Sequence, residues 1–169
     1  MRLAFAALLT SAALAAPAAA QSGGEPVFQG GHQDWRVFTR GEGDSRVCYA
    51  TSRPSESLPA SVDHGEVYFL VSTWANGAAD EQPSFLAGYA LRPASPPRVR
   101  VGADRFTMFV SEQEGFVEEA RDEARLVDAM KRGSSMRVEA MSARGTATAY
   151  EFSLSGVTAA LQKVEDLCD

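Results

Sequence analysis

The stretch that decides the fold runs from Ser134 to Cys168 and reads SSMRVEAMSARGTATAYEFSLSGVTAALQKVEDLC. Apolar and polar residues alternate from Met136 to Met141 and again from Thr148 to Leu154. A period of two is typical of a half-buried strand. Arg144-Gly145-Thr146 stands between the two runs and supplies a tight turn. This part of the chain therefore predicts a β-hairpin.

The period changes after Ser155-Gly156. Apolar residues then recur three or four positions apart, on one face of a helix, at Val157, Ala160, Leu161, Val164, Leu167 and Cys168. The spacing predicts a helix over about 156–167. Cys168 lies on its apolar face, so a disulfide to Cys48 would hold this helix against an early strand.

The rest of the chain consists of short apolar segments between Gly- and Pro-rich turns. Six further strands are predicted, at 35–39, 46–50, 67–71, 85–91, 99–101 and 106–110. Loops are predicted at 53–64 and 111–115. A second helix is predicted over about 118–132, with acidic residues near its start, Lys131-Arg132 at its end and Gly133 as a stop. The pattern indicates a mainly β fold, a β-sandwich with two added helices.

The first twenty residues have the features of a cleaved signal peptide. Met1-Arg2 is a short basic start, an apolar run follows, and Ala18-Ala19-Ala20 is a small-residue cleavage site, with the cut near Ala20-Gln21. A retained membrane anchor is the alternative. We expect a flexible lead-in at 21–31, a single β-sandwich domain at 32–169, and no membrane span in the mature form.

Charge and cysteines limit the partners. The predicted signal peptide takes one of the 16 basic residues and none of the 22 acidic ones, so the mature chain has a net charge of −7. Without a basic stripe, an acidic domain is a poor candidate for binding nucleic acid or anionic lipid. In an exported protein, Cys48 and Cys168 are expected to form a structural disulfide rather than two separate thiols.

No standard catalytic pattern is present in the sequence. There is no Gly-x-Ser-x-Gly elbow, and no ligand spacing predicts a metal or a cofactor. Ser61-Val62-Asp63-His64 holds the residue types of a triad, but neighbours in one loop rarely adopt triad geometry. A hydrolase-type enzyme whose site gathers His64 or His32 from distant segments is the rival hypothesis.

Aromatic residues suggest a different kind of site. Trp74 stands at the end of a predicted strand, and Phe85 and Tyr89 follow closely in sequence. Large aromatic side chains are enriched where proteins bind one another, so these three form a candidate contact patch for a partner. Burial in the core is the alternative for each of them.

Three segments resemble the invasion associated locus B family of exported bacterial proteins. They are Trp35-Arg36-Val37, the run from Leu126 to Gly133, and the run from Phe152 to Leu161. The chain departs from many members in having fewer cysteines, with Phe38 where they have Cys. The resemblance implies an immunoglobulin-like β-sandwich in the periplasm or at the cell surface, and no catalytic residues. In some host-associated bacteria the family name records a role in entering host cells.

These observations favour an exported, non-enzymatic binding or envelope-accessory protein. Its partner is expected to be a protein in the cell envelope or on a host surface. A contribution to host-cell interaction is one form of that role.

Overall fold

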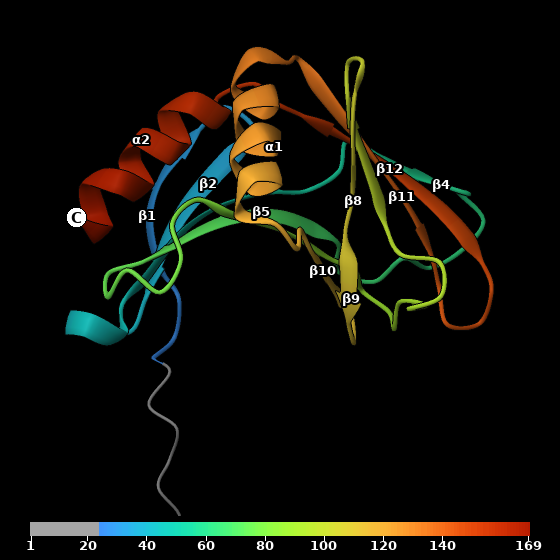
Figure 1. Ribbon diagram of the computed structural model, residues 1–169, viewed down its shortest axis with the longest axis horizontal. Coiled ribbons are helices and arrows are strands. Elements are labelled where there is room, and N and C mark those ends of the chain that lie inside the picture. Colours follow the sequence, from blue (N-terminus) through green and yellow to red (C-terminus); the bar gives the residue numbers. More distant parts are fainter. Residues whose placement is uncertain (1–23) are drawn as a thin grey trace, which may run out of the picture.

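Two antiparallel sheets and two helices make up residues 24–169, the part of the chain that the computed structural model describes (Figure 1). The larger sheet has the strand order β1-β2-β3-β5-β6-β10-β9. Its strands are β1 (Val27–His32), β2 (Trp35–Arg40), β3 (Val47–Ser52), β5 (Tyr68–Trp74), β6 (Gln82–Leu86), β9 (Phe109–Ser111) and β10 (Glu114–Phe116). A short 3₁₀ turn, Gly43–Ser45, precedes β3.

The smaller sheet has the strand order β4-β12-β11-β7-β8. Its strands are β4 (Glu56–Leu58), β7 (Arg98–Val101), β8 (Asp104–Thr107), β11 (Ser135–Met141) and β12 (Ala147–Ser153). The two helices come late in the chain, as α1 (Ala120–Arg132) and α2 (Val157–Cys168). The prediction of a mainly β fold with two late helices is therefore confirmed.

One hydrophobic core lies between the sheets. Alternate residues of the longer inner strands point into it, as the burial of Trp35 and Val37 in β2 shows. Aromatic rings join the two sheets directly. The ring centroids of Phe69 and Phe152 lie 5.9 Å apart, and those of Phe85 and Tyr150 lie 5.5 Å apart.

The helices complete this core on the inner face of the larger sheet. α2 packs against β2, β3 and β5, and α1 lies between α2 and the smaller sheet, in contact with β6, β7 and β8 (Figure 1). Gly156 starts α2 at a φ of +90°, and a Cβ there would meet the carbonyl oxygen of His32 at 2.0 Å. Glycine is needed at this position because the chain is left-handed there and lies against the last residue of β1.

Three predicted loops are wrong in part, because each contains a strand. Residues 27–31 of the expected flexible lead-in belong to β1, which pairs with β2 from Val27↔Thr39 to His32↔Trp35. The 53–64 loop contains β4, which pairs with β12, and the 111–115 loop leads into β10, which pairs with β6. β12 and β6 are distant in sequence from β4 and β10, so local patterns cannot reveal those pairings. β1 instead pairs with the next strand, and its two glycines, a residue type depleted in strands, conceal it.

Two predicted strands also differ from the structure. The strand expected at 85–91 lies at Gln82–Leu86, since a Cβ on Gly88 would meet the carbonyl oxygen of His64 at 2.3 Å and the chain leaves the sheet there. The strand expected at 106–110 is divided at Met108. Its first half joins the smaller sheet as β8 and its second half joins the larger sheet as β9.

The predicted signal peptide, residues 1–20, lies outside the described residues. Within residues 24–169, no helix has the length and apolar character needed to cross a membrane.

Candidate binding surface

The three aromatic residues predicted as a contact patch do not lie together. Phe85 points into the core, where its side chain is fully buried against Tyr150, so it is not available to a partner. Tyr89 packs against the core and its hydroxyl lies 2.6 Å from Oγ1 of Thr148. Trp74 is half-buried at the end of β5, at a position that alternates with buried core residues. It therefore lies on the outer face of the larger sheet.

A row of aromatic rings crosses that outer face. Phe28 of β1, Phe38 of β2 and Tyr49 of β3 occupy directly paired positions. The ring centroids of Phe28 and Phe38 lie 5.5 Å apart, and those of Phe38 and Tyr49 lie 5.6 Å apart. Phe28 is 57% exposed. We call these three residues the aromatic row. Partial burial there raises the pKa of the Tyr49 hydroxyl, against the lowering effect of Arg40.

The sequence did not predict Phe28 or the aromatic row. The sequence pattern puts Phe28 in the expected flexible lead-in, and Phe38 stands out only through the resemblance, as the position where many family members have a cysteine. The sequence does show that Phe28 and Phe38, which pair across β1 and β2, are both apolar. The pairing that joins them depends on the register of three strands.

Beside the aromatic row lies a groove of about 700 Å³. Arg36, Phe38, Thr51, Arg53 and Tyr68 are among the residues that line it. Arg36 and Thr51 are directly paired across β2 and β3. The Arg36 side chain is exposed and forms no ion pair with any described residue. The groove therefore presents a cation that is available to a ligand.

Arg53 is held at the end of the groove. Its guanidinium pairs with the Glu66 carboxylate, donates to the Tyr68 hydroxyl and lies 4.9 Å from the centre of the Tyr68 ring. The hydrogen bond from Tyr68 to Glu66 raises the pKa of Tyr68, and burial adds to the same shift. Arg53 and Tyr68 thus contact each other and Glu66, whereas Arg36 has no such partner among the described residues.

Thr51 is the unusual polar residue of the groove. It is 8% exposed, and its Oγ1 is the one buried side-chain oxygen or nitrogen in the described chain that has no hydrogen-bond partner. A buried hydroxyl without a partner costs about 1–3 kcal/mol. The position therefore favours a bound group that can hydrogen bond to Oγ1.

Replacing Thr51 with Val is expected to raise the free energy of unfolding by about 1 kcal/mol, because valine has a similar shape and removes the unsatisfied hydroxyl. Urea denaturation of the two proteins measures the difference. Thr51→Ser is the matched control, since it keeps the hydroxyl and should bring no gain. A clear loss of stability in Thr51→Val would mean that the hydroxyl has a partner.

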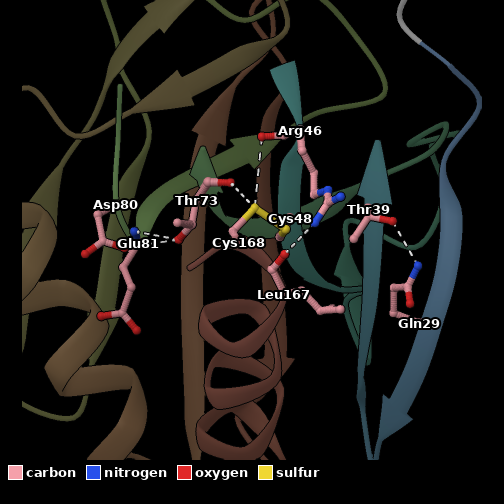
Figure 2. Close-up of a disulfide and its surroundings, with 9 residues drawn as sticks. All are labelled: Gln29, Thr39, Arg46, Cys48, Thr73, Asp80, Glu81, Leu167 and Cys168. Atoms are coloured by element: carbon pink, nitrogen blue, oxygen red, sulfur yellow. Dashed lines mark hydrogen bonds between the residues drawn. A yellow bond between two sulfur atoms is a disulfide. The ribbon is translucent and has the colours of Figure 1, made fainter. Parts of the chain in front are cut away.

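The two cysteines lie where the predicted disulfide requires them. Their sulfurs are 2.12 Å apart and their Cα atoms 5.9 Å apart, across 120 residues of sequence. Figure 2 shows the last turn of α2 brought against β3 at this point, with Arg46 Nη1 donating to the Leu167 carbonyl at 3.2 Å. The disulfide thus joins the end of α2 to the inner face of the larger sheet.

The triad residue types of the 61–64 segment do not form a triad. Nδ1 of His64 lies 2.8 Å from the Tyr150 hydroxyl, and Nε2 lies 3.1 Å from the Pro59 carbonyl oxygen. The Asp63 carboxylate accepts instead from the Gly65 amide at 2.9 Å. His64 is therefore part of a hydrogen-bond network, and neither a serine nor a carboxylate among residues 24–169 is hydrogen-bonded to its ring.

That network continues into the protein. The Tyr150 hydroxyl lies 2.9 Å from the Tyr89 hydroxyl, which lies 2.6 Å from Thr148, and Thr148 donates to the Ala140 carbonyl at 3.2 Å. Burial, then the hydrogen bond to Tyr89, raises the pKa of Tyr150 far above its usual value. Tyr150 is thus held as a neutral phenol, and the network joins the 53–66 segment to the smaller sheet.

Comparison with known proteins gives the family. The family model for the invasion associated locus B (IalB) protein matches residues 35–165. The crystal structure of invasion associated protein B from Bartonella henselae is similar in fold, with a TM-score of 0.56 and 12% sequence identity. The likeness covers 83% of this chain and 97% of that chain. No curated protein matches the sequence. The chain belongs to the invasion associated locus B family.

Proposed function

We propose that this protein is an exported, non-enzymatic binding protein that contacts a protein partner at the cell envelope through the outer face of its larger sheet. The observation that carries the proposal is the aromatic row, with Phe28 exposed and Phe38 and Tyr49 half-buried, on a face that neither helix covers. Both helices pack on the inner face. A monomeric domain usually keeps the outer face of a sheet polar, so a row of paired aromatic rings on that face favours a binding role.

The composition of this face suits a protein partner. Aromatic side chains supply much contact area and lose little conformational entropy when they are buried. The groove adds Arg36 and the Thr51 hydroxyl, which would fix the position of a polar group of the partner. Trp74 lies two residues beyond Ser72, the residue paired with Tyr49, so the contact could extend to it.

Family membership supports a role at the cell envelope or at a host-cell surface. The family and the Bartonella protein are both named for invasion. The resemblance that the sequence shows is to exported proteins. A partner in the envelope and a partner on a host cell would both use the same exposed face.

Replacing Phe28 with Ala is expected to weaken partner binding about tenfold or more, because truncating an aromatic anchor at an interface commonly costs that much. Crosslinking in living cells finds the partner first. A photoreactive residue at position 28 should give a defined adduct, whereas one at Leu58, an exposed apolar residue of the smaller sheet, should not.

The matched control for binding is Leu58→Ala, which removes a comparable exposed apolar side chain from the other sheet. Trp74→Ala then tests whether the contact extends along β5. The mass of the adduct distinguishes an envelope protein from a host-cell protein. Equal labelling from positions 28 and 58, or none from either, would contradict the proposed surface.

A further inference from the structure

Arginines meet on the outer face of the smaller sheet. Arg105 of β8, Arg100 of β7 and Arg137 of β11 occupy directly paired positions on three neighbouring strands. Arg98 lies two residues from Arg100 and therefore on the same face. These four residues line a groove of about 500 Å³, together with Glu139 and others. We call them the arginine face.

The charge of this face is not balanced within the sheet. Glu139 and Glu151 both pair with Arg137, at 3.0 and 2.8 Å. Arg98 is directly opposite Glu139 but forms no ion pair with it, because that carboxylate is bound to Arg137. Arg98, Arg100 and Arg105 have no ion pair or side-chain hydrogen bond to any residue in the part of the chain described. Three guanidinium groups thus remain free.

Pairing arginines directly across neighbouring strands destabilises the fold through charge repulsion, and an ordinary solvated surface has no need of such pairs. Residues directly opposite on neighbouring strands have Cβ atoms about 4.5–5.5 Å apart, and like charges in such pairs are destabilising. Charged side chains on an edge strand can protect it from aggregation, which accounts for Arg105 on β8. Arg100 and Arg137 lie on interior strands, where that reason does not apply.

We propose that the arginine face binds a phosphomonoester group. Such a group carries a charge of about −1.5 to −2 at neutral pH and three acceptor oxygens. A carboxylate carries one charge, and one guanidinium can satisfy it through two parallel hydrogen bonds. Three free guanidiniums therefore match the phosphomonoester better. Arginine is the residue best suited to such recognition, because its planar donors fit phosphate oxygens in pairs.

The site is separate from the aromatic row. It lies on the other sheet, so one ligand could be bound on each face. An acidic protein would repel most anions at a distance. The arginine face is a local region of positive charge that can attract an anion. Selectivity would come from the charge and shape of the bound group.

The test is an NMR titration of the mature protein, labelled with ¹⁵N, against phenyl phosphate, phenyl sulfate and benzoate. Phenyl phosphate is expected to give saturable shifts of the amides of β7 and β8 and of the arginine Nε–H signals. The two singly charged probes should give smaller shifts. Equal responses to all three, or no saturable response to phenyl phosphate, would overturn the proposal.

Arg100→Gln is expected to weaken phenyl phosphate binding about tenfold or more, since it removes a charge-assisted contact. Its melting temperature without ligand should be unchanged or higher, because a like-charge pair is relieved. Lys163→Gln removes the same charge from α2, which packs on the larger sheet, and should leave phenyl phosphate binding intact. If it weakens binding as much as Arg100→Gln, overall charge and not the arginine face is responsible.

Vesicles identify the source of the phosphate group. The protein is mixed with phosphatidylcholine vesicles with and without phosphatidic acid, and sedimentation measures the bound fraction. Binding that needs phosphatidic acid and is lost in Arg100→Gln supports a lipid headgroup. Binding of phenyl phosphate without vesicle binding supports a soluble phosphorylated ligand.

Discussion

Replacing Cys48 and Cys168 together with Ala is expected to lower the free energy of unfolding by about 4–5 kcal/mol. The disulfide closes a loop of 120 residues, and its removal restores the freedom of that loop in the unfolded chain. A domain of this size is stable by only about 5–15 kcal/mol, so the variant should be close to unfolding at room temperature. Urea denaturation of the variant and of the oxidised wild type measures the difference.

In the double variant, the loss of structure should begin at the end of α2. Both sulfurs are buried, and the helix end is otherwise held by the Arg46–Leu167 hydrogen bond and by apolar packing (Figure 2). Amide exchange is therefore expected to rise first in the last turn of α2 and then in β3. Thiol titration of the unreduced wild type should find no free thiol. Two reactive thiols, or a double variant as stable as the wild type, would contradict the role of the bond.

The elements that the sequence predicted well are those with local signals. The hairpin of β11 and β12 and the start of α2 depend on a period of two, a turn and a change of period, all within the Ser134–Cys168 stretch. Gly156 marks that change because the structure requires a left-handed residue there. The ends of α1 were also predicted, since charge near its start and Gly133 after its end are local features.

The elements that the sequence missed either lack a strand-like composition or depend on distant partners. The Gln29-Gly30-Gly31 segment looks flexible, yet β1 forms because β2 offers a free edge, and its glycines accommodate a register shift between Phe28 and Gly30. β4 is three residues long and pairs with β12, which lies far later in the chain. No local pattern predicts such a pairing, because its stabilising hydrogen bonds come from the tertiary structure.

The binding surfaces were harder to predict for the same reason. The sequence has no basic stripe, but Arg98, Arg100, Arg105 and Arg137 meet because three strands pair in one register. The alternation of arginine and valine over 98–101 is a local signal that one face of that strand is charged. Which charges lie opposite that face cannot be read from the sequence, since a shift of one residue would move them to the other side of the sheet.

Replacing Trp35 with Ala is expected to lower the free energy of unfolding by about 3–5 kcal/mol. Trp35 is the first residue of β2, is fully buried, and is among the largest side chains of the core. Its Nε1 donates to the Ser153 carbonyl at 3.0 Å, so one side chain joins the larger sheet to the last strand of the smaller one. The substitution would leave a cavity and an unpaired carbonyl at the junction of the sheets.

Trp35→Phe separates these two causes. Phenylalanine keeps most of the apolar volume but cannot donate, so the loss should be about 1–3 kcal/mol, the cost of one buried group without a partner. Urea denaturation of both variants gives the two values. If Trp35→Phe loses as much as Trp35→Ala, the hydrogen bond to Ser153 holds the sheets together and the packing adds little. If Trp35→Phe loses nothing, the junction depends on packing alone, and Trp35 is needed at the start of β2 for its size.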